Sequence, residues 1–302
     1  MARVMLIGAN GQLGSDLSRE IQSGPHDLVR LNRTDMDIRD HEHVADLLAS
    51  LRPNVILNTA AFHKVEACEE DADQAFAVNC IAVRNLAIAA DRIGAYLVHV
   101  STDYVFDGEG RVPYPEEATP NPVNVYGVSK AAGEFFVRSL CRRHLIIRTS
   151  GLYGIAGSSG KGGNFVQTML RHGRDKGVVS VVTDQVLSPT YTFDLARSIR
   201  RLAETEAQGL YHVTNTGSCS WYEFAKAVFE VSGMQAEVRP IDTAASGSTV
   251  RRPAYSVLAN RRLEREGYEP LPTWSAALKH YLHAVAGMEP SPVQAGVSNA
   301  AT

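Results

Sequence analysis

A short apolar run leads directly into a glycine-rich turn at the start of the chain. Residues 4–7 (VMLI) precede GANGQLG at 8–14, and a helical pattern follows over 13–22. Glycines let backbone N–H groups approach a pyrophosphate closely, and the N-terminus of the following helix favours negative charge. The spacing G-x-x-G-x-x-G departs from the usual G-x-G-x-x-G, so an ordinary tight turn is the alternative interpretation. We expect the turn to bind dinucleotide phosphates through Gly8, Asn10, Gly11, Gln12, Leu13 and Gly14.

The rest of the first half repeats this alternation of strand and helix. Short β-branched runs, which are candidate strands, lie at 3–7, 28–31, 55–58, 96–101 and 145–149. Longer helical patterns lie between or after them, at 13–22, 41–51, 72–93 and 125–141. The candidate strands are apolar almost throughout, as expected when helices cover both faces of a sheet. The pattern predicts an α/β fold with a doubly wound, parallel, Rossmann-type sheet.

The pattern changes after about residue 150. A glycine- and serine-rich loop is followed by helical patterns at 164–174, 192–206, 220–232 and 274–286. Further candidate strands lie at 178–183, 211–214 and 238–240. We expect a dinucleotide-binding domain over 1–150, a smaller and partly interleaved substrate-binding lobe over 151–287, and a disordered tail over 288–302, which lacks periodicity.

Composition argues against several classes of protein. The formal net charge of −3 and the absence of long runs of like charge argue against a nucleic-acid partner. No apolar stretch approaches the roughly 20 residues of a membrane span, and the first strand begins too early for a signal peptide. The four cysteines, at 68, 80, 141 and 219, show no metal-ligand spacing and are expected to be reduced. We therefore expect a cytoplasmic protein without a metal site.

A tyrosine and a lysine far downstream supply candidate proton chemistry. Tyr126 and Lys130 are four residues apart and share one face of the expected helix, and Thr102 follows the apolar strand at 96–101. A free tyrosine titrates near pH 10, so a neighbouring positive charge is needed to lower its pKa for proton transfer. The alternatives are a surface pair and a threonine that caps a turn. With the glycine turn, the set indicates a nicotinamide-dependent carbonyl or alcohol oxidoreductase.

The end of the second strand bears on the choice of cofactor. An acidic residue there favours the ribose 2′-hydroxyl of NAD, whereas a cation suits the 2′-phosphate of NADP. Asn32 and Arg33 occupy this place and favour NADPH, with NADH as the alternative, unless the arginine is simply a solvated surface residue. Asp37 and Ile38 are placed to contact adenine. The small residues Ala60 and Ala61, after the third strand, let the backbone pass close to the ribose and nicotinamide.

Several longer stretches resemble the extended short-chain dehydrogenase/reductases, and within them the dTDP-4-dehydrorhamnose reductase family. The resemblance runs from residue 1 to about 286, and STDYVF with NVYGxSKxxGE is specific for this branch. The matching stretches are GANGQLG (8–14), NTAAFHKVEACEEDADQAFAVN (58–79), STDYVFDG (101–108), NVYGVSKAAGE (124–134), RTSGLYG (148–154), GNFVQTML (163–170), DQVLSPT (184–190) and RRPAYSVLAN (251–260).

The resemblance implies a role for each matching residue. Tyr126 is the general acid/base, Lys130 binds the ribose and tunes the tyrosine, and Thr102 positions the sugar carbonyl. The implied cofactor contacts are Gly8, Gly11, Gln12 and Leu13 for the pyrophosphate, Asp37 and Ile38 for adenine, and Ala60, Ala61 and Asn79 for the ribose and nicotinamide. The candidates for the nucleotide-sugar side are Asp103, Gly151, Asn164 and Arg252, with Lys64 and Lys161 as weaker ones.

Two departures from the family pattern fall in the expected sugar pocket. Gly151 stands where many members have tryptophan, and Tyr255 adds a phenol where RPANS is usual. We expect the loss of the aromatic ring to widen the pocket unless Tyr255 replaces it. On this hypothesis Gly151→Trp sharpens the preference among 4-keto sugars.

The resemblance implies NADPH-dependent reduction of the 4-keto group of a nucleotide-linked 6-deoxy sugar, by a chain that forms no membrane contact and is compatible with a homodimer. One alternative is an epimerase or dehydratase of the same superfamily, which needs a tightly held NAD. Another is a non-catalytic subunit similar to the regulatory subunit of animal methionine adenosyltransferase. The complete set Thr102, Tyr126 and Lys130 favours an enzyme.

Overall fold

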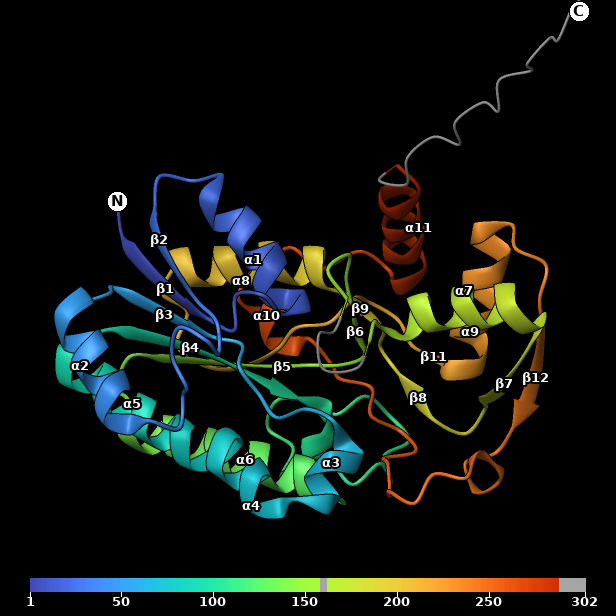
Figure 1. The fold of residues 1–302 in the computed structure, drawn as a ribbon, viewed down its shortest axis with the longest axis horizontal. Helices are drawn as coiled ribbons and strands as arrows, with labels where there is room; N and C mark the ends of the chain where they lie inside the picture. Colours follow the sequence, from blue (N-terminus) through green and yellow to red (C-terminus); the bar gives the residue numbers. More distant parts are fainter. Residues whose placement is uncertain (158–161, 288–302) are drawn as a thin grey trace, which may run out of the picture.

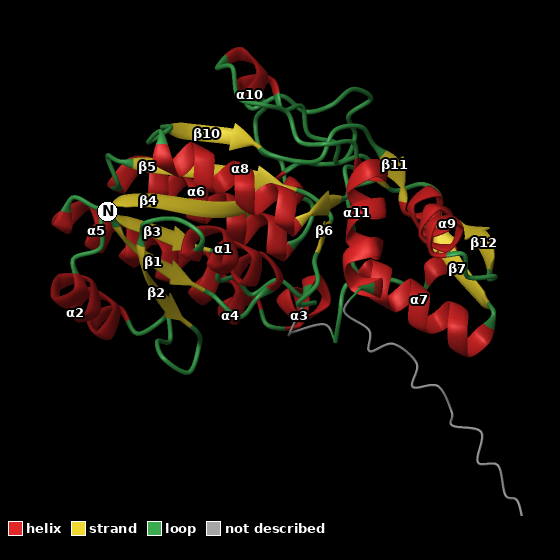
Figure 2. Cartoon of the chain, turned by 90° about the horizontal axis from the view of Figure 1, so that it is seen from above, coloured by secondary structure: helices red, strands yellow, loops and turns green. Residues whose placement is uncertain are grey.

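The computed structural model describes residues 1–157 and 162–287, which form a large parallel sheet flanked by helices and a smaller lobe beside it (Figures 1 and 2). Lys161 and the tail 288–302 lie outside the described residues. The sheet has six parallel strands in the order β10-β5-β4-β3-β1-β2. This confirms the predicted Rossmann-type α/β fold. The bounds are β1 (Arg3–Ile7), β2 (Asp27–Leu31), β3 (Val55–Asn58), β4 (Tyr96–Thr102), β5 (His144–Thr149) and β10 (Gly209–His212).

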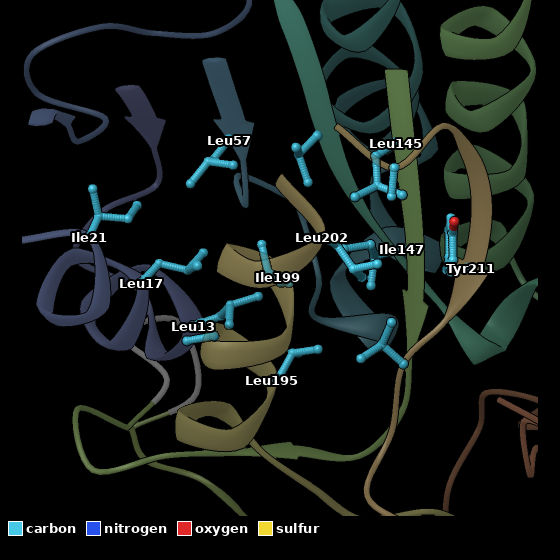
Figure 3. Close-up of a cluster of buried hydrophobic side chains, with 14 of the residues drawn as sticks. Leu13, Leu17, Ile21, Leu57, Leu145, Ile147, Leu195, Ile199, Leu202 and Tyr211 are labelled. Carbon is cyan, nitrogen blue, oxygen red and sulfur yellow. The ribbon is translucent and has the colours of Figure 1, made fainter. Parts of the chain in front are cut away.

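Helices cover both faces of this sheet, which explains why its strands are apolar on both sides. α1 (Gln12–Gln22) and α8 (Thr192–Glu204) cover one face, and α2 (His41–Leu51), α5 (Ala82–Ile93) and α6 (Val125–Leu140) cover the other (Figure 1). Figure 3 shows the first face, where the leucine and isoleucine side chains of α1 and α8 meet those of the strands. Each face thus has its own buried hydrophobic cluster.

The expected helix over 72–93 is interrupted. It consists of α4 (Ala72–Phe76), a π-helical segment η1 (Ala77–Ile81) and α5, and the short helix α3 (Val65–Glu70), which the sequence did not predict, precedes it. The buried Asn79 lies in the π-helical segment, and its side chain bonds both the N–H and the carbonyl of Phe62 at 2.9 Å. π-Helical turns are rare and are found frequently at functional sites. Here the turn joins the helix to the loop after β3.

The second lobe is built around aromatic residues. Its core contains Tyr153, Tyr191, Phe224 and Tyr281, with ring centroids 5.2–5.6 Å apart in the contacting pairs. Three two-stranded pairs and three longer helices surround this core. They are β6 (Leu152–Tyr153) with β9 (Thr190–Tyr191), β7 (Val178–Val182) with β12 (Glu237–Ile241), β8 (Val186–Leu187) with β11 (Cys219–Ser220), and α7 (Phe165–Lys176), α9 (Trp221–Ser232) and α11 (Trp274–Ala286). Short helical turns are η2 (Asp103–Val105), η3 (Ala244–Ser246) and α10 (Arg261–Arg265).

The chain crosses between the two parts more than once. β10 pairs with β5 in parallel and completes the main sheet, although it follows much of the second lobe in the sequence. The expected strand at 211–214 therefore begins at Gly209 and ends at His212. α8 likewise leaves the second lobe and packs against α1. Among the described residues, no helix is long and apolar enough to cross a membrane.

Candidate active site

The glycine turn after β1 is tightly packed against its own backbone at Gly14 and against the segment after β3 at Gly8. Gly8 has φ +83°, and a Cβ on Gly14 would lie 2.1 Å from the Gly8 carbonyl oxygen. A side chain at either position is therefore excluded, which explains two of the three glycines in the motif. The Gly8 and Ala9 N–H groups donate to the Leu31 carbonyl at 2.9 and 3.3 Å, which places the turn beside the end of β2. This arrangement fits a pyrophosphate at the N-terminus of α1.

The residues after β2 form a polar turn beside this cradle. Asp35 accepts the Asn32 N–H at 2.8 Å and so holds the turn closed. The Asn32 side-chain oxygen is buried without a hydrogen-bond partner, and a ribose hydroxyl is a suitable donor for it. Arg33 is exposed next to it. The unpartnered oxygen and the cation together fit a nucleotide ribose that carries a phosphate.

Asp37 and Ile38 were expected to contact adenine. Asp37 pairs with Arg39, whose hydrogen bonds hold the pKa of this carboxyl at about 2. Ile38 is only 8% exposed and belongs to the hydrophobic cluster that includes residues of α2. Most of its side chain therefore packs inside the protein, and its contact with adenine stays a prediction. Asp37 is half-buried beside it.

A cavity of about 440 Å³ lies between the sheet edge and the second lobe. Its walls come from the glycine turn, the ends of β4 and β5, the start of α6, and the second lobe. The sequence-predicted residues that line it are Gly11, Gln12, Leu13, Gly14, Ala61, Thr102, Asp103, Tyr126, Lys130, Gly151 and Asn164. Those that do not line it are Gly8, Asn10, Asn32, Arg33, Asp37, Ile38, Ala60, Asn79, Lys64 and Arg252.

The start of α6 brings the proposed catalytic side chains together. Asn124 caps the helix by accepting the Gly127 N–H at 2.8 Å. A Cβ on Gly127 would lie 2.1 Å from the Tyr104 carbonyl oxygen, so only glycine lets the helix approach this closely. Tyr126 is thereby held within hydrogen-bonding reach of Thr102. One turn on, Lys130 donates to the Val100 carbonyl at 2.7 Å.

Burial controls the charges of this pair. Desolvation lowers the pKa of Lys130 to about 8, opposed by the nearby carboxylate of Glu134. Desolvation also raises the pKa of Tyr126 above its usual value, and the hydroxyl of Thr102 opposes this shift. Desolvation is therefore the dominant effect among the protein groups, and the lowering of the Tyr126 pKa by Lys130 together with the nicotinamide ring stays a prediction.

Asn79 supports the site from behind. Besides its two hydrogen bonds to the Phe62 backbone, its amide donates to the Ser129 hydroxyl at 3.1 Å. Ser129 in turn donates to the Tyr126 carbonyl at 2.8 Å. These bonds occupy the Asn79 amide and fix the loop that carries Ala61 against α6. The structure thus places Asn79 behind the cavity wall, where it orients two cofactor-side segments.

On the substrate side, Asn164 joins two segments of the cavity wall. It caps α7 by accepting the Gln167 N–H at 2.9 Å, and it donates to the Gly154 carbonyl at 2.8 Å. The N–H of the same Gly154 donates to Gln12 of the glycine turn at 3.1 Å. The Gly154 residue therefore connects the cofactor cradle to the second lobe.

Arg252 lies outside the cavity lining. Its guanidinium pairs with Glu66 of α3 and donates to the Ser248 hydroxyl, and its side chain is 19% exposed. It also interacts with Tyr104, which does line the cavity. A diphosphate contact by Arg252 therefore requires competition with Glu66, and it stays a prediction. Lys64 is exposed and also outside the lining.

The surroundings of Gly151 bear on the expected widening of the sugar pocket, which stays a prediction. This glycine lines the cavity with φ +55°, and a Cβ there would lie 2.6 Å from Leu187 Cδ1 and 3.2 Å from Pro189 Cα. Leu187 thus occupies the space next to residue 151 that an added side chain needs. Tyr255 does not replace the missing ring, because it is outside the lining and its ring lies 6.4 Å from that of Tyr114.

We therefore expect Gly151→Trp to destabilise the fold instead of sharpening sugar preference. Positive φ and overpacking each cost about 1–3 kcal/mol. The measurement is the free energy of urea-induced unfolding of Gly151→Ala and Gly177→Ala. Gly177 has φ +68° with open space around it, so its variant carries backbone strain alone. Equal losses for the two variants would contradict the proposed clash with Leu187.

Some cavity residues were not singled out by the sequence argument. Tyr104, Ser150 and Ser256 lie within matched stretches, so their positions were a usable signal. Phe165 and Trp221 form an aromatic pair in the second lobe, with ring centroids 4.5 Å apart. Trp221 lies at the start of α9 outside every matched stretch, and nothing in the local sequence separates it from a core aromatic.

The fold and this cavity define a class of protein. A parallel sheet with a glycine turn after β1, and threonine, tyrosine and lysine at the carboxyl edge, are features of the extended short-chain dehydrogenase/reductases. The chain belongs to the RmlD substrate binding domain family, whose model matches residues 2–286. This confirms the predicted family.

Individual relatives agree with this assignment. The chain is 42% identical to the spore coat polysaccharide biosynthesis protein SpsK of Bacillus subtilis over 93% of this chain and 97% of that protein. It is 39% identical to the dTDP-4-dehydrorhamnose reductase of Streptomyces griseus over 96% of each chain. The dTDP-4-dehydrorhamnose reductase of Bacillus anthracis, solved in complex with NADP, matches with a TM-score of 0.90 and 41% identity, over 94% of this chain and 99% of that one.

Proposed function

We propose that this chain is a dTDP-4-dehydrorhamnose reductase, which reduces the 4-keto group of a nucleotide-linked 6-deoxy sugar with NADPH. The observation that carries the proposal is the single cavity in which the glycine cradle, Thr102, Tyr126 and Lys130 meet residues of the second lobe. A curated relative at 39% identity and a solved structure at 41% identity carry this activity in their names, and the solved structure is a complex with NADP.

In this proposal the protein supplies binding and one proton. NADPH supplies the hydride when it is bound. Tyr126 donates its phenolic proton to the carbonyl oxygen as negative charge develops there, and Thr102 holds that oxygen in place. Lys130, held by its hydrogen bond to the Val100 carbonyl, binds the ribose. Its positive charge stabilises the tyrosinate that remains after Tyr126 has donated its proton. Exclusion of water from the occupied site strengthens each of these contacts.

The test is consumption of NADPH with dTDP-4-dehydrorhamnose and with other 4-keto sugar nucleotides, followed by identification of the product. Turnover with stoichiometric oxidation of NADPH is expected. An epimerase or dehydratase would return its cofactor unchanged and would show conversion of the sugar without net oxidation. The UDP-glucose 4-epimerase of Thermus thermophilus matches at 22% identity and a TM-score of 0.80, which is a likeness of fold alone.

Cofactor choice gives a separate prediction. We expect Arg33→Ala to weaken binding of NADPH about tenfold or more and that of NADH little, because only NADPH has a 2′-phosphate for the guanidinium. Fluorescence titration with both cofactors measures the two affinities. Arg30→Ala removes the same charge from an exposed position within β2 and is the matched control. Equal weakening for NADPH and NADH in Arg33→Ala would argue against a phosphate contact.

We also propose how the chain is organised around this reaction. Residues 1–150 with β10 hold the cofactor, and 151–287 supply most of the walls for the sugar nucleotide. The exposed apolar side chains of Ile81, Val128 and Phe135 support a homodimer through α6 and the π-helical segment. Four buried free cysteines support a reducing compartment such as the cytoplasm.

A further inference from the structure

A buried carboxyl lies at the centre of the cavity wall. Asp103 is only 3% exposed, and it accepts the Thr102 hydroxyl at 3.1 Å and the Ser150 hydroxyl at 2.8 Å. A third hydroxyl, that of Ser256, also bonds this carboxyl. The carboxyl therefore accepts hydrogen bonds from three hydroxyl groups and is in direct contact with the residue proposed to hold the sugar carbonyl.

The proton of Thr102 can serve one acceptor at a time. Its hydroxyl oxygen accepts the Tyr104 N–H at 3.2 Å and has a second lone pair within reach of Tyr126. Its single proton is directed to Asp103 Oδ1. In this arrangement the Thr102 hydroxyl does not direct its proton to a carbonyl oxygen in the cavity, because that proton is already shared with Asp103.

The arrangement reverses when Asp103 is a neutral acid. Its O–H then donates to the Thr102 oxygen, while its other oxygen still accepts the Ser150 hydroxyl. With the Tyr104 N–H and Asp103 O–H as its two donors, Thr102 turns its own proton outward. This proton is then available to the substrate oxygen, beside the phenol of Tyr126.

We propose that Asp103 is a positioning residue that directs the Thr102 hydroxyl, as a carboxylate toward itself and as a neutral acid toward the sugar carbonyl. The inference rests on the proposed reductase function. It adds that proton uptake by Asp103 controls the activity of this site. No net chemistry is added, because one proton moves onto Asp103 and the hydroxyl protons only rotate. The hydride and Tyr126 proton still make the product alcohol.

The surroundings of Asp103 shift its titration toward neutral pH, so that the neutral acid persists to a higher pH than in a free aspartate. Desolvation raises its pKa to about 6, opposed by its hydroxyl partners. The titratable groups that face it are the phenols Tyr104 and Tyr126. Beyond Tyr104 lie Arg252 and Glu66, and Lys130 lies one turn along α6 from Tyr126. The elements β5 and 251–256 contribute neutral hydroxyls to it, Ser150 and Ser256.

The test is the pH profile of kcat/KM for the wild type and Asp103→Asn. The wild type should lose activity about tenfold per pH unit above the pKa of Asp103 in the free enzyme. In Asp103→Asn the amide donates to Thr102 at every pH while its oxygen accepts from Ser150, so this alkaline decline should disappear. Asp107→Asn, the same change four residues on and outside the cavity lining, should keep the wild-type profile.

Ser150→Ala should displace the alkaline decline in kcat/KM without abolishing it. Removal of a donor to the carboxylate favours the neutral acid, so the decline should move to higher pH. Infrared difference spectra of the chain without substrate provide a readout independent of turnover. They should contain a buried carboxylic acid band that fades with rising pH and is missing in Asp103→Asn.

The outcomes separate this inference from the function itself. If the wild type consumes NADPH but Asp103→Asn retains the same alkaline decline, the role of Asp103 is wrong and the reductase stands. A carboxyl that is ionised throughout the active pH range, by infrared, would also overturn it. If the wild type oxidises no NADPH with any 4-keto sugar, the proposed function fails first, and the infrared titration still tests Asp103.

Discussion

Tyr126→Phe should lower kcat by at least a few hundred-fold and leave NADPH binding almost unchanged. The phenol lines the cavity within hydrogen-bonding reach of Thr102, and loss of a positioned acid typically costs about 10²–10⁴-fold. The ring itself remains, with its edge contact to Tyr104 at 5.8 Å between centroids. The change therefore removes the proton and keeps the packing.

The experiment compares single-turnover rates and NADPH affinity for the two enzymes. Tyr114→Phe is the control, because it deletes a phenol that bonds Asp107 at 2.6 Å and lies outside the cavity lining. Its kcat should remain near the wild-type value. A Tyr126→Phe variant with near wild-type turnover would show that another group protonates the sugar oxygen.

The four central strands of the main sheet, β1, β3, β4 and β5, were predictable from sequence because each is largely an apolar run, whereas β10, with the sequence GLYH, was expected two residues later. β1 and β3 begin and end where predicted, and β4 is one residue longer, ending at Thr102. The cofactor turn was predictable for a similar reason. Gly14 is required by contacts within its own strand–turn–helix unit, and Gly8 has a positive φ in the same turn, although the atoms nearest to a Cβ on Gly8 belong to Thr59 and Ala60 after β3.

Features that depend on distant segments were not predictable in this way. Leu187 occupies the space beside Gly151, and Glu66 pairs with Arg252 across 186 positions of sequence. The π-helical turn contains Asn79, whose side chain bonds the distant Phe62 backbone, and a periodic helical pattern in the sequence does not indicate such a turn. Such contacts are set by the folded arrangement, so the sequence identified the residues of the site without their partners.

The ion pair between α6 and β5 is another contact between separate segments, and the largest stability prediction rests on it. Glu134 and Arg148 are each 1% exposed, and they form two hydrogen bonds of 2.6 and 2.9 Å. Ser101 also donates to Glu134, at 2.5 Å, and the Arg148 guanidinium lies 5.1 Å from the centroid of the Phe106 ring. The pair fastens the helix of Tyr126 and Lys130 to β4 and β5.

We expect Glu134→Gln to reduce the free energy of unfolding by about 3–5 kcal/mol, because it leaves the Arg148 charge buried without a counter-ion. Arg148→Met should cost a similar amount by leaving the carboxylate alone. The double variant should lose less than the sum of the two, since neither charge then remains. Denaturant unfolding of all three measures this. Asp91→Asn, which breaks an exposed pair with Arg142, should cost at most about 1 kcal/mol. If Glu134→Gln lost no more than Asp91→Asn, burial of the pair would not be what fixes α6 to the sheet.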